Sequence, residues 1–202
     1  MDTYLPPIFV ESLKGLKGFN KDAFEKIHHS GEQVTSIRLN PFKTNSISEA
    51  ISIAETVAGN IPWTSHGYYL SRRPSFTLDP AFHSGAYYVQ EASSMFLEQV
   101  LQQCVDLSSP IKVLDLCAAP GGKSTLIQSL ISTKSLLVCN EVIKTRVNIL
   151  AENITKWGAA NVIVTNSDPK DFERLPNYFD AIVVDAPCSG SGLFRKDAAA
   201  IE

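Results

Sequence analysis

The sequence predicts an α/β fold with a doubly wound parallel sheet, and two observations carry this prediction. From residue 111 onward, short apolar runs of strand length alternate with segments of helical periodicity, which is typical of parallel strands connected by helices. Three of these runs lead to an acidic residue, namely Asp115, Glu141 and Asp185. Because the carboxyl ends of parallel strands meet at one edge of a sheet, we expect the three acids to face a common crevice.

Residues 1–85 precede this pattern and are predicted to form a small mixed α/β N-terminal domain, with residues 86–202 forming the second domain. Pro6-Pro7 opens a first helix, and Asn20 is an expected N-cap for a second helix over 21–29. Residues 34–39 alternate like a strand, and Ser46 or Ser48 is expected to cap a helix over 47–58. The aromatic-rich stretch 61–90 predicts short strands and loops.

The second domain begins with a predicted helix over residues 90–104, whose apolar side chains fall on one helical face. After it we expect, in order, strand 111–116, helix 121–132, strand 135–139, helix 143–157, strand 161–165, a short helix near 169–175 and strand 179–184. Apolar strands in this arrangement predict a sheet that is covered on both faces.

The loop after Asp115 is the predicted ligand site. It runs through small residues, Leu116-Cys-Ala-Ala-Pro-Gly-Gly122, and leads directly into a helix. Unpaired amides at a helix start, together with the positive end of the helix dipole, bind anions or polar nucleotide-like ligands. Gly122-Lys-Ser124 matches the end of a phosphate-binding loop, so a P-loop NTPase is an alternative. That loop, however, needs glycine where Cys117 stands, and the adjacent Gly121 and Gly122 do not form the GxGxxG pattern of nicotinamide enzymes.

A ligand with a nucleoside and a small anionic tail, but no polyphosphate, fits these features and predicts S-adenosylmethionine. Its carboxylate would meet the amides near Ala119 to Gly122. Glu141 would accept hydrogen bonds from both ribose hydroxyls, and Asp168 would reach the amino edge of the adenine. Each acid also has a purely structural interpretation, Glu141 as a solvated acid in the first turn of a helix and Asp168 as the N-cap ahead of Pro169.

Several segments of the sequence together resemble the motifs of a known enzyme family. They are Asp115-Leu-Cys-Ala-Ala-Pro-Gly-Gly-Lys123, Asn140-Glu141, Asp168, Asp185-Ala-Pro-Cys-Ser-Gly-Ser-Gly192 and, ahead of them, Val89-Gln-Glu-Ala-Ser-Ser-Met95. From about residue 60 to its end the chain resembles the Nol/Nop/Sun RNA cytosine-5 methyltransferases, and the bacterial ribosomal RNA members are nearest in layout. The resemblance implies a Rossmann-like S-adenosylmethionine-dependent methyltransferase sheet, with RNA, and ribosomal RNA in particular, as the partner.

The cofactor site that we expect on this basis is a set of ten residues: Cys117, Ala118, Ala119, Pro120, Gly121, Gly122, Lys123, Glu141, Asp168 and Asp185. The catalytic residues that we expect are Asp185 and Cys188.

Methylation of cytosine at carbon 5 requires a nucleophile and a group that binds the base. Because carbon 5 is a poor nucleophile, a thiolate must first add at carbon 6. Asp185 would hold the exocyclic amine and ring nitrogen of a base that has left its stack. The mechanism by itself predicts that Cys188 is the attacking thiol. The resemblance instead implies that Cys188 assists product release and that the nucleophilic cysteine lies in a later motif. Cys188 as an inert buried thiol stays an alternative, and Cys117 and Cys139 are predicted to lie in the core.

We expect this chain to be a fragment of a longer enzyme. No cysteine follows Cys188, and four strands are predicted where a methyltransferase sheet has seven. The strand at 179–184 would then be an unprotected apolar edge. Such a fragment is expected to bind the cofactor without methylating RNA. A catalytically inactive RNA-binding scaffold with the same fold is a further alternative.

Composition restricts the remaining possibilities. The net charge of −3 and the pI near 5.8 argue against a strongly basic nucleic-acid binder, so RNA contacts would come from local patches such as Arg72-Arg73 and Arg195-Lys196. The four cysteines form no CxxC pair, which predicts no metal site and no disulfide framework and favours a reducing cytoplasm. The sequence has no export signal and no apolar run long enough for a membrane span, and it leaves the oligomeric state open.

Overall fold

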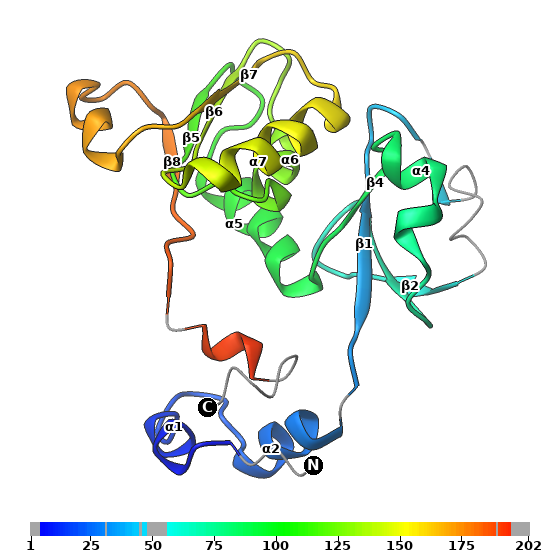
Figure 1. The fold of residues 1–202 in the computed structure, drawn as a ribbon. Coiled ribbons are helices and arrows are strands. Elements are labelled where there is room, and N and C mark those ends of the chain that lie inside the picture. The colour runs from blue at the N-terminus through cyan, green and yellow to red at the C-terminus, as the bar shows by residue number, and fades with distance from the viewer. Residues whose placement is uncertain (1–4, 31, 45, 48–55, 189, 195–202) are drawn as a thin grey trace. The chain divides into compact units, whose positions relative to one another are not determined.

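The structure is a computed structural model that describes residues 5–30, 32–44, 46–47, 56–188 and 190–194 (Figure 1). Its contacts group the chain into two units, Met1–Val34 together with Pro187–Glu202, and Thr35–Ala186. The domain boundary that we expect near residue 85 divides the chain differently and stays a prediction.

The first unit consists of short helices joined by aromatic contacts. It contains the helices α1 (Pro7–Ser12) and α2 (Lys21–Ser30) and the 3₁₀ turn η5 (Ser191–Leu193). The Ala23 amide donates to Asn20 Oδ1 at 2.9 Å, so the predicted N-cap of the second helix is confirmed. The rings of Phe9 and Phe194 pack edge to face with their centroids 5.2 Å apart, which joins α1 to the residue that follows η5.

The second unit contains an antiparallel sheet and a parallel sheet. The antiparallel sheet has the order β2-β3-β1-β4, with β1 at Thr35–Leu39, β2 at Val57–Asn60, β3 at Gly67–Leu70 and β4 at Tyr87–Val89. Every residue of β1 is buried, and Ile37 and Leu39 pack with Phe76 and Tyr87 in its core. The short elements η2 (Phe76–Leu78) and α4 (Pro80–His83) connect β3 to β4. The strand predicted at 34–39 and the short strands predicted within 61–90 are therefore confirmed.

The helix predicted over residues 47–58 is wrong at its C-terminal end. Residues 57 and 58 belong to β2, where Val57 pairs with Leu70 of β3. Strand pairing satisfies the backbone groups of this segment, and this tertiary contact overrides the local helical pattern. Residues 48–55 of the predicted helix lie outside the described residues.

The parallel sheet has the order β7-β6-β5-β8, and it positions the site. Its strands are β5 (Lys112–Asp115), β6 (Leu136–Asn140), β7 (Val162–Thr165) and β8 (Ala181–Val183), and between them lie α6 (Gly122–Leu130), α7 (Lys144–Trp157) and the 3₁₀ helix η4 (Pro169–Arg174). The predicted alternation of strands and helices is confirmed (Figure 1). As expected, β8 is an edge strand of this sheet within the described residues.

The sheet is covered less completely than the sequence predicts. Along β5 and β6 the inner residues are buried, and Val113, Leu137 and Cys139 join α6 and α7 in one core cluster. On the outer strands, however, Ile163 and Ile182 are exposed. Coverage of both faces is therefore confirmed at the centre and wrong at the edges of the described sheet.

The helix predicted over residues 90–104 begins later than expected. The chain forms the 3₁₀ helix η3 (Ala92–Phe96) and then α5 (Leu97–Cys104). Gln90 remains extended because its amide donates to Ser36 O of β1 at 3.2 Å, which continues the pairing of β4 with β1. This extended position brings the Gln90 side chain to the start of α6.

Candidate cofactor and base site

The loop between β5 and α6 presents unpaired amides. Gly121 has a φ of 108°, a left-handed conformation that favours glycine, and this turn allows α6 to begin at Gly122. No side chain caps the helix, and the amides of Gly122, Lys123 and Ser124 donate to no acceptor within the described residues. These amides and the helix dipole form a positive surface suited to a carboxylate.

Hydrogen bonds from α7 hold the outer side of this loop. Arg146 donates to the Ala119 carbonyl at 2.6 Å, and Asn153 donates to the Pro120 carbonyl at 2.8 Å. Because the loop carbonyls are engaged by α7, their oxygens do not compete with an anion for the free amides of α6. The site is therefore organised before a ligand binds.

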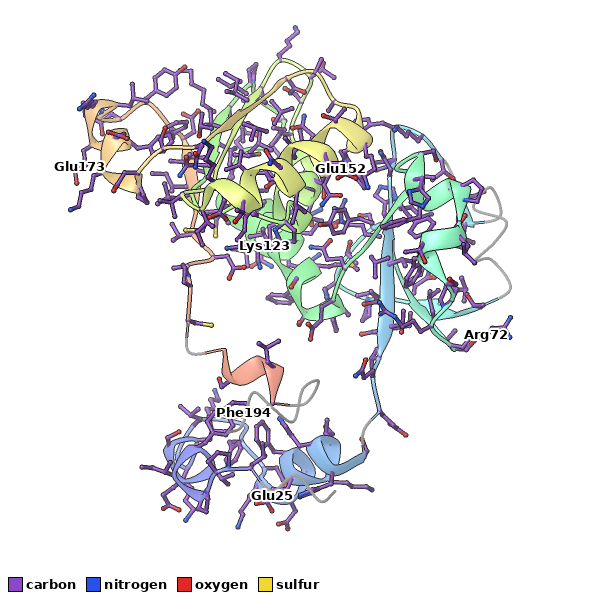
Figure 2. All side chains as sticks on the ribbon, viewed as in Figure 1. Glu25, Arg72, Lys123, Glu152, Glu173 and Phe194 are labelled. Atoms are coloured by element: carbon purple, nitrogen blue, oxygen red, sulfur yellow. The ribbon has the colours of Figure 1, made fainter. Side chains whose placement is uncertain are left out.

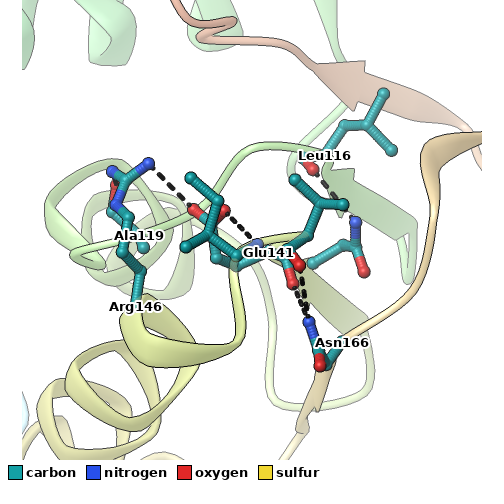
Figure 3. A network of polar contacts seen from close by, with 8 residues as sticks. Leu116, Ala119, Glu141, Arg146 and Asn166 are labelled. Carbon is teal, nitrogen blue, oxygen red and sulfur yellow. Dashed lines mark hydrogen bonds and ion pairs between the residues drawn. The ribbon is translucent and has the colours of Figure 1, made fainter.

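Glu141, at the carboxyl end of β6, is only 2% exposed. Its Oε1 accepts from the Ile143 amide at 3.0 Å, and its Oε2 forms an ion pair with Arg146 at 3.3 Å but accepts no hydrogen bond of good geometry (Figure 3). Asn166 donates to the Glu141 carbonyl at 2.7 Å. The carboxylate is thus buried and oriented, which excludes the interpretation of Glu141 as a solvated acid.

Asn140, the neighbour of Glu141, joins three strand ends. Its side-chain Nδ2 donates to Leu116 O at 3.2 Å. Its Oδ1 accepts from Thr165 Oγ1 at 2.9 Å and from the Ser167 amide at 3.0 Å. These bonds connect the loop after β5, the end of β6 and the segment after β7. Asn140 therefore links the strand ends where the crevice is expected, although Asp115 and Glu141 are buried there.

Asp168 is exposed and caps the 3₁₀ helix η4. Its Oδ1 accepts from the Lys170 amide at 2.9 Å. The structural interpretation of this residue is therefore confirmed, although its other carboxylate oxygen accepts no hydrogen bond within the described part of the chain. Contact of Asp168 with an adenine stays a prediction.

Lys123 and Asp185 face one another across the sheet edge. Lys123 Nζ lies 2.5 Å from Asp185 Oδ2, and Lys123 belongs to the first turn of α6 (Figure 2). The pair borders a pocket of about 260 Å³. Its other lining residues come from the segment between β4 and η3 and from the loop that leads into α6, namely Tyr88, Val89, Gln90, Glu91, Ser94, Cys117, Ala118, Ala119, Pro120 and Gly122. The pocket therefore unites most of the predicted cofactor loop with Asp185, whereas Glu141 and Asp168 are not among its lining residues.

The cysteines differ in their surroundings. Cys139 is fully buried, as predicted, and burial raises its pKa to about 12. Cys117 is only half-buried and lines the pocket, so its placement in the core is wrong in part. Burial, followed by the nearby carboxylates of Glu141, Asp115 and Asp185, raises the pKa of the Cys117 thiol, which opposes thiolate formation there. Cys188 is exposed and belongs to the first unit, so its interpretation as a buried thiol is wrong and its catalytic role stays a prediction.

Asp115 lies beneath the loop and is fully buried. Ser124 Oγ donates to its Oδ2 at 2.7 Å, while Oδ1 has no partner. Burial raises the pKa of Asp115 from 3.8 to about 6, against the opposing effect of the Ser124 hydrogen bond. The Asp115 carboxyl therefore binds its proton more tightly in the folded protein than in the unfolded chain. The folding stability that this proton adds is fully present below pH 3.8 and is lost as the pH rises through about 6.

We expect Asp115→Asn to remove this pH-dependent loss of folding stability. The loss amounts to about 2–3 kcal/mol, at 1.36 kcal/mol per pKa unit. Urea unfolding at pH 4 and pH 7.5 measures it: the variant should gain stability relative to the wild type as the pH rises. Asp171→Asn, at an exposed position of η4, is the control and should follow the wild type at both pH values. An equal difference between Asp115→Asn and wild type at both pH values would contradict the prediction.

Three residues of the site were not predicted. Arg38 is far from the motifs in sequence, and Arg146, although it follows Glu141 by five residues, belongs to none of them. Gln90 lies within the segment Val89–Met95 that resembles the family, but the resemblance assigned it no role. The structure shows that Arg146 connects the loop to Glu141, and that Arg38 connects Gln90 to α6.

Neither metal nor membrane is indicated by the described residues. They contain no group of three or more His, Cys, Asp or Glu side chains that could hold a metal ion. No helix among them is long and apolar enough to cross a membrane.

The parallel sheet, its glycine-containing loop and the acid after the second strand place the chain among the Rossmann-like methyltransferase domains, and solved structures agree. The structure of PH0851 matches with a TM-score of 0.85 and 26% identity over 99% of this chain and 45% of that chain. A methyltransferase homologue from Pyrococcus horikoshii matches with a TM-score of 0.68 and 28% identity over 96% of this chain and 67% of that chain. The structure of NSun6 from Pyrococcus horikoshii with SFG, at 19% identity, shares the fold with a TM-score of 0.73 and covers 92% of this chain and 71% of that chain.

Two family models narrow this class, because between them they match most of the chain. One describes the 16S rRNA methyltransferase RsmB/F and matches residues 103–201, and the other describes the N-terminal domain of 16S rRNA methyltransferase RsmF and matches residues 5–92. The chain belongs to this RsmB/F family.

Curated relatives of the chain carry the name ribosomal RNA small subunit methyltransferase F. The protein from Erwinia tasmaniensis is 35% identical over 98% of this chain and 43% of its own length, and the protein from Pectobacterium atrosepticum is 39% identical over 82% of this chain and 35% of its own length. The chain thus spans less than half of the length of these relatives. The P-loop alternative is not favoured, because the matching families and relatives are methyltransferases.

Proposed function

We propose that this chain carries the cofactor-binding part of an S-adenosylmethionine-dependent RNA cytosine-5 methyltransferase that acts on 16S ribosomal RNA in the cytoplasm. The observation that carries the proposal is that three unpaired helix amides, the buried carboxylate of Glu141 and the Lys123–Asp185 pair all lie at the carboxyl edge of one parallel sheet. Family membership supports the RNA substrate and the methyl donor.

The residues present fit S-adenosylmethionine. The amides of Gly122, Lys123 and Ser124 are free to meet its carboxylate. The sequence predicts this contact near Ala119 to Gly122, but the Gly121 amide donates to the Ala118 carbonyl, so the proposed contact lies slightly later, at the start of α6. Glu141, whose Oε2 accepts no hydrogen bond, would bind the ribose hydroxyls. Asp168 would bind the adenine through the oxygen that does not cap η4. When bound, the cofactor supplies an electrophilic methyl group.

The base would lie at the mouth of the pocket, beside Asp185. Asp185 would accept a hydrogen bond from the exocyclic amine of cytosine, and Lys123 would hold that carboxylate in place through the 2.5 Å ion pair. Addition of a thiolate at carbon 6 makes carbon 5 nucleophilic, and Cys188 would assist product release afterwards. Because no cysteine follows Cys188 in this sequence, we propose that the attacking thiol is not supplied by this chain.

RNA contacts are proposed for the exposed pair Arg72-Arg73, of which Figure 2 labels Arg72. The Arg73 guanidinium lies 5.3 Å from the centre of the Phe76 ring, but both arginines remain accessible to phosphates. The other predicted patch, Arg195-Lys196, lies outside the described residues.

Calorimetry with two nucleotide ligands tests the proposed cofactor. We expect the chain to bind S-adenosylhomocysteine and to give no heat of binding with ATP and Mg²⁺. The loop offers free amides but engages Lys123 with Asp185, and so does not provide the lysine that a triphosphate needs. Binding of ATP in place of S-adenosylhomocysteine would overturn the assignment. Methyl incorporation into a cytosine-containing RNA by this chain alone would refute the absence of the nucleophile.

A further inference from the structure

Gln90 carries a buried hydrogen-bond donor that has no partner. The residue is 6% exposed and lines the pocket beside the start of α6. Its Oε1 accepts from Arg38 Nε at 2.8 Å, whereas its Nε2 has no hydrogen bond. Burying an unpaired amide donor is unfavourable, so its retention in the pocket indicates an acceptor that arrives with a ligand.

The direction of this donor follows from Arg38. A guanidinium donates hydrogen bonds and accepts none, so the atom of Gln90 that faces Arg38 must be the oxygen. Arg38 itself is held by bonds to Thr125 Oγ1 at 2.7 Å and to the carbonyls of Gly122 and Thr125, both at 3.3 Å. The amide group of Gln90 cannot rotate without breaking its bond to Arg38, so its NH₂ group stays fixed beside Gly122.

The NH₂ group lies beside the start of α6, where the first amides are free. A Cβ atom built on Gly122 would be 3.6 Å from Gln90 Nε2 and 3.4 Å from Tyr88 Cε1. The side-chain donor of Gln90 therefore lies near Gly122, where the helix begins with free main-chain donors. Such a group of donors is suited to an anion.

We propose that Gln90 Nε2 donates a hydrogen bond to the carboxylate at the amino-acid end of the cofactor, with Arg38 as the positioning residue. This proposal rests on the proposed function. It selects the carboxylate over the nucleoside because Glu141 and Asp168, the proposed ribose and adenine partners, do not line this pocket. We assign the contact to the carboxylate and not to the base because Gln90 lies beside Gly122, whereas the proposed partner of the base is Asp185.

The variant Gln90→Glu tests this assignment with little change in shape. The new carboxylate keeps an acceptor for Arg38 but replaces the pocket donor with an oxygen. We expect the affinity for S-adenosylhomocysteine to fall at least about tenfold, because two carboxylates would face each other. The affinity for 5′-methylthioadenosine, which lacks the amino-acid tail, should stay within about twofold. Calorimetry of both ligands with the purified chain measures the two effects.

Gln103→Glu is the matched control, because it makes the same substitution at an exposed position of α5 and should bind both ligands like the wild type. If Gln90→Glu binds S-adenosylhomocysteine as tightly as the wild type, or loses the same factor for both ligands, the carboxylate contact is wrong. If the wild type binds neither ligand, the proposed function fails instead.

Gln90→Met covers the case in which Gln90→Glu does not fold. Methionine has a similar length and carries neither donor nor charge, and circular dichroism shows whether the variant is folded. We expect it to lose about fivefold in affinity for S-adenosylhomocysteine and to keep its affinity for 5′-methylthioadenosine. Unchanged affinity for both ligands would overturn the proposal.

Discussion

Replacing Glu141 with Gln is expected to weaken the binding of S-adenosylhomocysteine by about 30- to 150-fold. Glu141 is buried, and its Oε2 has no hydrogen bond of its own, so it is prepared to accept from a ribose hydroxyl. An amide keeps one acceptor but loses the charge, and hydrogen bonds to charged groups contribute about 1.5–3 kcal/mol each. A loss of about 2–3 kcal/mol corresponds to this range of affinity.

The matched control is Glu152→Gln on the outer face of α7 (Figure 2). The Glu152 side chain is 69% exposed and pairs with Lys156 at 3.1 Å, and ion pairs at the surface contribute little to stability. The control should bind S-adenosylhomocysteine like the wild type in the same titration. A Glu141→Gln variant that also binds like the wild type would remove Glu141 from the cofactor site and leave it with a purely structural role beside Arg146.

Arg38→Ala is expected to lower the free energy of unfolding by about 3–4 kcal/mol. Arg38 is 1% exposed, and its guanidinium donates to Gln90, Ser129 and three acceptors in Gly122 and Thr125 while lying 4.5 Å from the centre of the Trp157 ring. Burial lowers its pKa to about 9, which still leaves it protonated at pH 7. The substitution creates a cavity and leaves the Gln90 oxygen buried without a donor. Denaturant unfolding at pH 7 measures the loss.

Arg38→Met separates packing from hydrogen bonding. Methionine fills much of the space but offers no donor, so we expect this variant to lose about 1–3 kcal/mol, the cost of an unsatisfied buried acceptor. Because Arg38 positions Gln90, both variants should also bind S-adenosylhomocysteine more weakly. If Arg38→Met is as stable as the wild type, the desolvation of the guanidinium cancels its hydrogen bonds, and Arg38 does not stabilise the contact between β1 and α6.

Local sequence patterns predicted most elements of the parallel sheet, because apolar strands and helix signals repeat there at short range. Strands were expected at 111–116, 135–139, 161–165 and 179–184, and each is present within a few residues. The errors occurred where partners are distant in sequence. Val57 entered a strand by pairing with Leu70, and Gln90 stayed extended by pairing with Ser36.

The sequence by itself determined the alternating sheet, the small-residue loop that leads into α6 and the acids that follow its strands, because each depends on residues close together in the chain. Only the tertiary structure decided that Glu141 is buried against Arg146, that Lys123 pairs with Asp185, and that Gln90 turns its amide nitrogen toward Gly122. In the last case the contact depends on Arg38, which is 52 residues from Gln90 along the chain and lies in the neighbouring strand β1. Contacts of this kind depend on packing and hydrogen-bond geometry between distant segments, and no local pattern encodes them.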